Sequence, residues 1–251
     1  MTESNQQAAA DLLLAARADP ARRLAALPEA LRPADQAAAY AIQRCVMAQL
    51  GLIGGWKVGA ANPQAAPICG PMPASRIALQ PITLRLAPGY DRGVEAEMAF
   101  RMKADLPPRG IDYTRDEVIA AIASAHPAIE WLQPRFRDAD AVDPLSHLAD
   151  TQSHGGFVYG EAVHGWHSID FTAETVTQAV GDEPAVTRTG NPGGEMIRLV
   201  AWLANVGAAW AGGLRAGQFV TCGSWTGKTM VSAGQHVAVG FPSLGRVELT
   251  A

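Results

Sequence analysis

The sequence predicts a β-rich α+β protein with helices at its N-terminus. Runs rich in Ala and Leu, which are strong helix formers, fill much of the first fifty residues. Later the chain turns to short runs of Val, Ile and Leu separated by Gly and Pro, as in proteins built mainly from strands. The 251 residues are 48% hydrophobic, enough for one compact domain with a large core. We therefore divide the chain into a helical lead-in, residues 1–55, packed on a β-rich body, residues 56–251.

Four helices are expected, two of them in the lead-in. The first two cover residues 6–18 and 34–50, with prolines between them and glycines after residue 50. The third covers residues 114–124, where Thr114 and Glu117 have the spacing of a capping box. The fourth covers residues 194–211, whose Ile, Leu and Val residues supply an apolar face.

The body contains one expected hairpin and a series of expected strands. Gly181-Asp182-Glu183-Pro184 supplies the turn of the hairpin, residues 172–190. The other strands are short apolar runs bounded by turn-forming residues. They cover residues 56–58, 82–86, 94–101, 128–132, 156–163, 219–222, 236–239 and 245–249.

The composition argues against several function classes. The net charge of −4 leaves no electrostatic footprint for nucleic acid or an anionic membrane. Cys45, Cys69 and Cys222 are too few and too scattered for a disulfide framework or a Cys-x-x-Cys metal site, which indicates a reducing compartment. No basic leader and no apolar run of about 18 residues is present. We expect a cytoplasmic protein with a small-molecule partner.

Glu95 and Glu97 are the first candidate site residues. They share one face of the expected strand 94–101, and side chains at positions i and i+2 lie roughly 6–7 Å apart. Carboxylates so placed could converge on a hard cation such as Mg²⁺, Mn²⁺ or Ca²⁺. For this pair alone, an exposed polar strand face is the favoured interpretation. The apolar residues that alternate with them are Val94, Ala96, Met98 and Phe100.

Glu130 stands in the apolar stretch Ala128-Ile129-Glu130-Trp131-Leu132. A buried ionised carboxylate is costly unless it is paired or bound to a metal. A salt bridge with Arg135 or Arg137 and a role as metal ligand are equally compatible with this pattern.

Lys57 lies within Gly54-Gly55-Trp56-Lys57-Val58-Gly59. Glycines let a ligand approach the backbone closely, and a lysine there could orient an anionic substrate or transfer a proton. The alternative is an edge-strand lysine that resists aggregation, which the residues alone favour.

Two polar stretches also resemble catalytic motifs. Asp150, Ser153 and His154 lie close together, but the members of a nucleophilic triad normally come from distant positions, so a polar turn is favoured. Residues 221–229 end in Gly227-Lys228-Thr229 like a phosphate-binding loop. Cys222 stands where that motif needs a glycine, and a strand rather than a helix is expected to follow, so we reject nucleotide binding.

Taken in order, these blocks resemble the 2-keto-4-pentenoate hydratase and 4-oxalocrotonate decarboxylase branch of the fumarylacetoacetate hydrolase superfamily. The resemblance covers nearly the whole chain. It rests on Ala39-Tyr40-Ala41-Ile42-Gln43, Gly55-Trp56-Lys57-Val58-Gly59, Val94-Glu95-Ala96-Glu97-Met98-Ala99-Phe100, Pro127-Ala128-Ile129-Glu130, Ala149-Asp150, Gly190-Asn191-Pro192, Trp202-Leu203-Ala204-Asn205, Leu214-Arg215-Ala216-Gly217 and Gly223-Ser224.

This resemblance implies a mixed β-sandwich roll, a 2-oxo acid substrate and a homo-oligomer. It also implies Mg²⁺ or Mn²⁺ on three carboxylates, which leave open positions for a 2-oxo carboxylate. Residues are then assigned by position. Glu95, Glu97 and Glu130 match the metal ligands, Lys57 the catalytic lysine and Ser153 a serine of the substrate pocket. Asp150 and His154 are further catalytic candidates, and Arg135 and Ser224 are further substrate-binding candidates.

The implied reaction is the hydration of a 2-hydroxy-2,4-dienoate to a 4-hydroxy-2-oxo acid, as in aromatic meta-cleavage catabolism. Stabilised enolate charge lets the dienoate ketonise and accept water at C4. Lys57 would hold or protonate the substrate, and Asp150, His154 or bound water would be its acid–base partner.

The chain departs from the hydratase pattern in places that touch the substrate. Residues 68–75 replace a Pro-Asp-Phe-Gly block, Gln133-Pro134-Arg135 replaces Asp-Ser-Arg, and Thr151 replaces an asparagine. The alternatives are a 4-oxalocrotonate-type decarboxylase, an acylpyruvate hydrolase and, outside catalysis, a degenerate partner subunit.

Overall fold

The computed structural model describes residues 1–85 and 92–251, and its first elements are the two predicted helices. These are α1 (Glu3–Ala18) and α2 (Gln36–Leu50). The side chains of Thr2 and Asp35 accept backbone N–H groups in the first turns, as N-caps do. Gly51 ends α2 with φ of 94°, a conformation that favours glycine.

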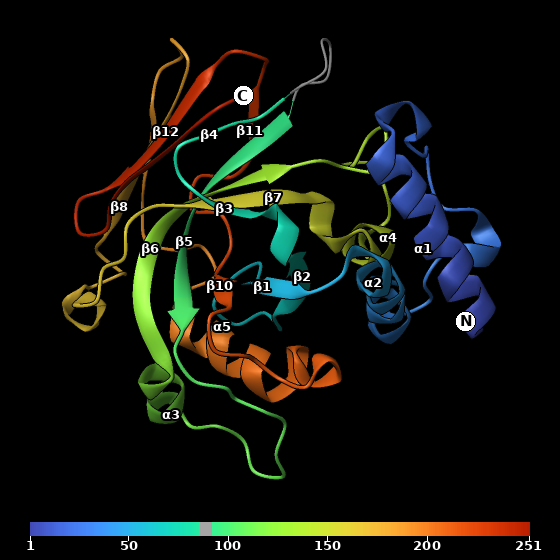
Figure 1. Cartoon of the computed structure of the whole chain (residues 1–251), viewed down its shortest axis with the longest axis horizontal. Helices are drawn as coiled ribbons and strands as arrows, with labels where there is room; N and C mark the ends of the chain where they lie inside the picture. The colour runs from blue at the N-terminus through green and yellow to red at the C-terminus, as the bar shows by residue number, and fades with distance from the viewer. Residues whose placement is uncertain (86–91) are drawn as a thin grey trace.

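The described strands form two sheets (Figure 1). The order of the larger sheet is β2 (Ile68–Pro73), β1 (Ile53–Gly59), β10 (Phe219–Thr221), β5 (Arg92–Met102), β6 (Ile122–Leu132), β7 (His154–Tyr159) and β3 (Ile77–Leu79), with β11 (Thr229–Val231) also paired with β5. Its two edge strands are β2 and β3, and only Ala74–Arg76 lies between them in the sequence. So short a connection brings the two edges close together, so the sheet must curl into a roll.

The smaller sheet contains the predicted hairpin and packs beside the long strands β5 and β6 (Figure 1). The hairpin turns at residues 181–185, between β8 and β9. The strand order is β4 (Ile82–Thr83), β13 (Gly245–Thr250), β12 (His236–Phe241), β8 (Thr175–Val180) and β9 (Val186–Thr189).

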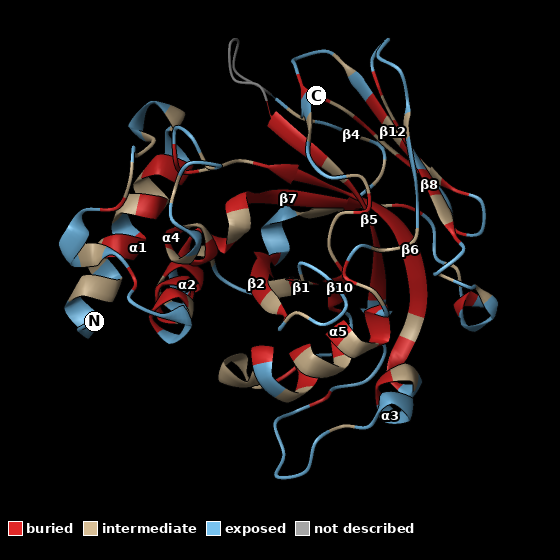
Figure 2. Ribbon diagram, turned by 180° about the vertical axis from the view of Figure 1, so that it is seen from behind, coloured by how far each residue is buried: buried red, intermediate tan, exposed pale blue. Residues whose placement is uncertain are grey.

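Strand β5 separates two environments. Its residues Val94, Ala96, Met98 and Phe100 are buried in the main core, which also contains residues of the smaller sheet and of α5 (Met196–Trp202). Glu95 and Glu97 point to the opposite side, into the roll. Figure 2 shows that β5 and β6 are buried along most of their length, so even the polar face of β5 is covered.

The lead-in helices pack on the segment between β6 and β7 rather than on the sheets alone. In that segment lies α4 (Pro144–Ala149). Figure 1 shows α1, α2 and α4 grouped on one side of the molecule. One apolar cluster joins them, and it consists of Ala9, Ala10, Leu13, Leu27, Ala39, Ile42, Val46, Phe136, Leu148 and Ala149.

Several predicted bounds were wrong. The helix expected at residues 114–124 is the shorter α3 (Arg115–Ala120), and β6 begins at Ile122 because it pairs with β5 over its whole length. The helix expected at 194–211 is α5 followed by a π-helical turn, Leu203–Gly207. The strand expected at 156–163 is β7, which starts and ends earlier. The strand expected at 82–86 is only β4, and its last residue, Leu86, lies outside the described residues.

Some elements were not predicted at all. Strand β2 has the sequence Ile-Cys-Gly-Pro-Met-Pro, in which glycine and prolines resemble a loop, and β3 and β11 are only three residues long. Helix α4 was also missed. No helix in residues 1–85 and 92–251 is long and apolar enough to cross a membrane.

Candidate metal and substrate site

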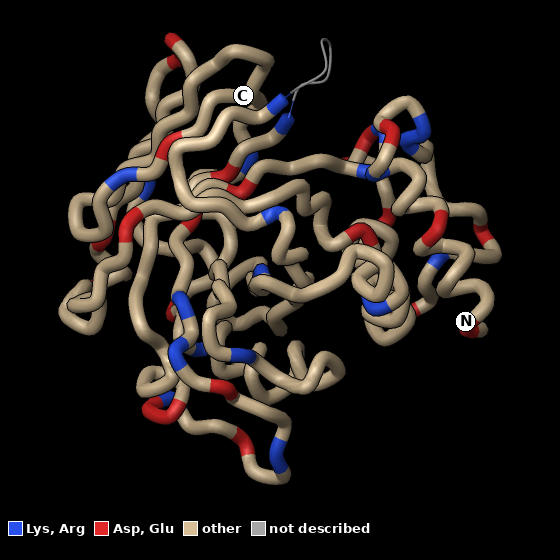
Figure 3. The backbone as a smooth tube through the Cα atoms, viewed as in Figure 1, with Lys and Arg blue, Asp and Glu red and all other residues tan. Residues whose placement is uncertain are grey.

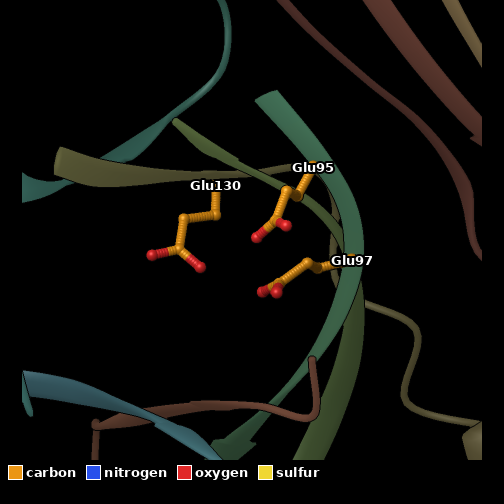
Figure 4. A group of neighbouring side chains, drawn as sticks. All are labelled: Glu95, Glu97 and Glu130. Atoms are coloured by element: carbon orange, nitrogen blue, oxygen red, sulfur yellow. The ribbon is translucent and has the colours of Figure 1, made fainter. Parts of the chain in front are cut away.

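Three carboxylates meet inside the roll. Glu95 and Glu97 come from one face of β5, and Glu95 is paired in register with Glu130 on β6. One oxygen from each lies within 4.8 Å of the others, and Figure 4 shows the three carboxylates pointing toward one another. Within the described residues no other group of three His, Cys, Asp or Glu side chains has such geometry.

This acidic cluster fits a divalent cation. Burial, and then the neighbouring carboxylates, raise the pKa of Glu97 well above its usual range and the pKa of Glu95 to about 7. At neutral pH a bound cation is therefore needed to keep both carboxylates fully ionised. Carboxylate oxygens are the hard ligands that Mg²⁺, Mn²⁺ and Ca²⁺ prefer.

Lys57 and His154 both contact Glu130. Lys57 Nζ lies 2.8 and 2.9 Å from the two Glu130 oxygens, and His154 Nδ1 lies 2.8 Å from Oε1. Burial opposes charge on Glu130, but Lys57 and His154 outweigh it and lower its pKa. Burial lowers the pKa of His154 to about 4, so its ring is neutral and donates the Nδ1 proton to Glu130.

Thr221 supports the cluster from β10. Its hydroxyl makes a hydrogen bond with the Glu97 carboxylate, and it lies 3.1 Å from the backbone oxygen of Met98. Thr221 is therefore an outer partner that orients Glu97, as hydrogen-bonded neighbours of metal ligands commonly do.

Arg135 and Asp150 form a buried ion pair, which the sequence did not reveal. The Arg135 side chain also donates to the backbone oxygens of Gln133 and His154, each at 2.6 Å. Neither residue lines the two cavities described below. The Asp150 carboxylate holds the Arg135 side chain and backbone N–H, and the substrate-binding role of Arg135 and the acid–base role of Asp150 stay predictions.

His154 lies against the acidic cluster, and its catalytic role stays a prediction. Its side chain is fully buried and lines neither cavity. Its ring positions Glu130. Of the two alternatives left open for Glu130, the salt bridge with Arg135 or Arg137 is absent among the described residues: Glu130 pairs with Lys57, and Arg135 pairs with Asp150.

The segment Thr151–Ser153 brings a backbone carbonyl and a hydroxyl to the site. All three residues have left-handed backbones, with φ of 50°, 51° and 63°. Non-glycine residues in this region cost about 1–3 kcal/mol each and persist only where their surroundings hold them. The Gln152 carbonyl accepts a hydrogen bond from Lys57 Nζ at 3.3 Å.

Two cavities open at the acidic cluster. The smaller, about 160 Å³, touches Glu95, Glu97 and Ser224, and the Ser224 hydroxyl oxygen is buried without a hydrogen-bond partner among the described residues. The larger, about 530 Å³, is lined by Arg23, Lys57, Gly93, Glu95, Leu132, Pro134, Arg137, Asp138, Ala139, Asp140, His147, Gln152, Ser153, Lys228 and Met230.

The predicted Lys57, Ser153 and Ser224 therefore lie at cavities beside the carboxylates, whereas His147, Gln152, Thr221 and Lys228 were not predicted as site residues. Lys228 belongs to the rejected phosphate-loop motif, and it forms an ion pair with Asp140 at 2.6 Å. The rejection agrees with the structure, since β11 rather than a helix follows Gly227.

Basic and acidic residues are mixed along the described chain. Figure 3 shows them interspersed, and no large region of the drawn backbone carries charges of one sign only.

Comparison with known proteins identifies the family. No protein-family model matches the chain. The chain is 30% identical over 253 aligned residues to 2-keto-4-pentenoate hydratase 2 of Dechloromonas aromatica (strain RCB), which covers 96% of this chain and 95% of that enzyme. The chain belongs to the 2-keto-4-pentenoate hydratase family. A second relative, the 2-hydroxyhexa-2,4-dienoate hydratase of Comamonas testosteroni, is 28% identical over 165 residues, 65% of this chain and 61% of that enzyme.

Solved structures share the fold of this hydratase family member. The 4-oxalocrotonate decarboxylase from Pseudomonas putida G7, complexed with magnesium and adipate, matches with a TM-score of 0.85 at 23% identity, over 100% of this chain and 98% of that one. A fumarylacetoacetate hydrolase family protein from Yersinia pestis CO92 matches with a TM-score of 0.56 at 14% identity, over 80% of this chain and 92% of that one. The predicted mixed roll with N-terminal helices is thus confirmed.

Proposed function

We propose that this chain is a divalent-metal-dependent hydratase that adds water to a 2-hydroxy-2,4-dienoate to give a 4-hydroxy-2-oxo acid. The observation that carries the proposal is the buried cluster of Glu95, Glu97 and Glu130, which contacts Lys57 and opens into a 530 Å³ cavity. Two relatives named hydratases, aligned over most or much of the chain, support the reaction class.

The three glutamates are the residues that would hold Mg²⁺ or Mn²⁺. A cation bound there supplies positive charge that stabilises the enolate of a 2-oxo acid. The raised pKa values of Glu95 and Glu97 support this assignment, because the cluster lacks enough positive charge of its own.

Lys57 binds the anionic substrate in this proposal. Burial favours its neutral form, but Glu130 and the other two carboxylates outweigh burial and raise its pKa. It therefore remains an ammonium at neutral pH and can donate hydrogen bonds to a substrate carboxylate or enol oxygen. Lys57 also lines both cavities, and this shared position suits a group that touches the reacting end of the substrate.

Ser224 and Ser153 are the proposed hydroxyl contacts with the substrate, one at each cavity. The buried, unpartnered oxygen of Ser224 supports such a contact, since a buried hydroxyl without a partner is costly. A homo-oligomer and a cytoplasmic location stay predictions from the resemblance and composition.

The test is hydration of a 2-hydroxy-2,4-dienoate by purified protein with Mg²⁺ or Mn²⁺. The substrate's ultraviolet absorbance should fall, and NMR should identify the 4-hydroxy-2-oxo acid. We expect Glu95→Gln and Glu97→Gln to lose at least 10²-fold in rate, whereas Glu183→Gln, in the exposed hairpin turn, should match the wild type.

Product analysis also separates the alternatives. Release of CO₂ from a 4-oxalocrotonate-like acid without hydration would replace the proposal by a decarboxylase, and two carboxylic fragments would indicate an acylpyruvate hydrolase. Saturating Mg²⁺ should also stabilise the wild type, by about 2.7 kcal/mol at one hundred times Kd, and this shift should be lost in Glu97→Gln. Absence of any shift in the wild type would contradict the metal site.

A further inference from the structure

His147 and Ser153 form a hydrogen-bonded pair in the wall of the larger cavity. His147 lies near the end of α4, and its Nε2 is 3.2 Å from Ser153 Oγ. Both side chains line the same cavity as Lys57 and Glu95. The pair is therefore in reach of a substrate whose 2-oxo end is held at the acidic cluster and whose carbon chain extends into the cavity.

The backbone around Ser153 is held tightly in an unfavourable conformation. Its φ of 63° follows two other left-handed residues. The Ser153 N–H donates to the Asp150 carbonyl at 3.2 Å, and its own carbonyl accepts the Gln133 N–H at 2.8 Å. Arg135 fixes Asp150 in turn. Strain maintained by so many contacts is typical of side chains that must be aimed at a ligand.

We propose that His147 is the general base of hydration and that it acts through the Ser153 hydroxyl on the attacking water. This inference rests on the proposed function. Ser153 would touch the water directly, which makes it a catalytic residue, whereas His147 works through Ser153 as a positioning and proton-accepting residue.

The surroundings of His147 favour its neutral form, which can accept a proton. Burial, and then the positive charges of Lys57 and Arg135, lower its pKa, while Asp140 acts in the opposite direction and Lys228 adds to the lowering. A neutral ring that carries its proton on Nδ1 presents Nε2 as an acceptor to the Ser153 hydroxyl.

The proton and electron balance of the step is complete. Nε2 of His147 takes the Ser153 hydroxyl proton while Ser153 Oγ takes a proton from water. The water oxygen bonds to C4, and the electron pair of the C3–C4 double bond moves toward the 2-oxo group to form the enolate. C3 then receives a proton from His147 through Ser153, which restores both side chains.

Other groups already occupy the remaining candidate bases at or near the cavity. In its lining, Asp140 is paired with Lys228. The Asp138 carboxylate, also in the lining, accepts the backbone N–H groups of Asp140 and Ala141. Asp150 is tied to Arg135, His154 is fully buried against Glu130, and Lys57 is an ammonium. His147 is only half-buried and lines the cavity.

The test separates ketonisation from hydration. A 2-hydroxy-2,4-dienoate is given to the Mg²⁺-loaded enzyme in D₂O, where ketonisation places deuterium at C5 and forms the 2-oxo-3-enoate, and hydration then forms the 4-hydroxy product. In His147→Gln we expect ketonisation near the wild-type rate and hydration slowed about 10²-fold, so that the enoate accumulates. His236→Gln, on the smaller sheet, should behave as the wild type in both steps.

Two further measurements exclude a purely structural effect. Because the pair acts as a unit, the double variant of His147→Gln and Ser153→Ala should be no slower in hydration than the slower single variant. Free imidazole should restore part of the hydration lost in His147→Ala.

The possible failures are distinct. A wild type that does not hydrate the dienoate would overturn the proposed function and this assignment with it. Two outcomes with a hydrating wild type would overturn the assignment alone. In one, His147→Gln hydrates as fast as the wild type; in the other, His147→Gln loses both steps in proportion and imidazole does not rescue His147→Ala.

Discussion

Lys57 offsets part of the negative charge in the acidic cluster. It is 7% exposed and contacts both oxygens of Glu130, which is fully buried. Breaking one partner of a buried ion pair commonly costs about 3–5 kcal/mol, because the other charge is left uncompensated. In the proposed function, Lys57 therefore contributes both to substrate binding and to the stability of the metal-free protein.

Lys57→Met should separate these two contributions. We expect loss of hydration and a lower free energy of unfolding without metal, but tighter Mg²⁺ binding, by at least tenfold, because a competing positive charge is gone. Isothermal titration with Mg²⁺ and urea unfolding measure the two effects. Lys103→Met, at an exposed position, is the control. Weaker Mg²⁺ binding in Lys57→Met would contradict the charge argument.

His126 provides a pH prediction away from the site. Its Nδ1 lies 2.9 Å from the Gly160 carbonyl and its Nε2 2.9 Å from Ser124 Oγ, a pattern that the neutral ring satisfies. Burial lowers its pKa from 6.5. The unfolded chain therefore binds more protons below pH 6.5, and the free energy of unfolding should fall as pH falls through this range.

Urea unfolding between pH 8 and pH 5 measures this effect. The difference in stability between the wild type and His126→Gln should shrink toward acid pH. A difference that stays constant over the range would show that His126 keeps the same pKa in the folded and unfolded chain.

At the residue scale, the strand pattern singled out three glutamates and Lys57. For Glu95, Glu97 and Lys57, however, it favoured surface roles, and the metal and active-site roles were predicted through the family resemblance. Glu95, Glu97 and Glu130 interrupt apolar strands, and Lys57 lies between glycines. Arg135, Asp150 and His147 belong to an irregular segment whose pairings depend on how the chain turns there. No local pattern could show that Arg135 faces Asp150 or that His147 reaches Ser153.

At the element scale, β6 and β7 fix the register on which the site depends. Glu130 is opposite Glu95 on one side and Phe157 on the other. Beside it, Gly156 lies directly against the Trp131 ring, where an added Cβ would come within 1.9 Å of Cζ2. Only glycine lets the two strands keep this register with Trp131 in place.

Gly156→Ala should disturb the site through this contact. We expect the free energy of unfolding to fall by about 1–3 kcal/mol, as for other overpacked positions, and Mg²⁺ affinity to fall as Glu130 and His154 shift. Gly240→Ala, where an added Cβ meets nothing within 4 Å, is the matched control for both measurements. A Gly156→Ala protein with unchanged Mg²⁺ affinity would show that the site is insulated from this contact.

The sequence predicted those elements whose residues have a strong preference for helix or strand. Strands rich in Val and Ile and helices rich in Ala were predicted. Their bounds differ where strand pairing decides them: β6 starts at Ile122 because it pairs with β5 from that residue on. Strand β2 was missed because its prolines and glycine resemble a loop, and its place is set by pairing with β1.

At the scale of the whole molecule, the lead-in helices hold the segment that carries His147, Asp150 and Ser153. Leu13 of α1 and Phe136 and Leu148 of the segment share one apolar cluster. This docking is a long-range contact that the sequence did not show, whereas the roll with N-terminal helices was predicted through the family resemblance.

Leu13→Ala tests the coupling between the lead-in and the site. Leu13 is 2% exposed, and such a truncation costs about 2–5 kcal/mol. We expect faster hydrogen exchange in residues 133–153 and slower hydration, whereas Leu52→Ala, at an 82% exposed leucine, should change neither. Faster exchange confined to α1 would show that the site segment is held without the lead-in.

The same apolar cluster has a consequence for the protein during translation. The ribosome makes Leu13 and Ile42 first, but their partners Phe136 and Leu148 emerge about a hundred residues later. At about 5–20 residues per second, the nascent helices present an uncovered apolar face for roughly 5–25 seconds. During that interval the growing chain exposes a surface that chaperones bind, and the segment that carries His147 and Ser153 is the part that finally covers it.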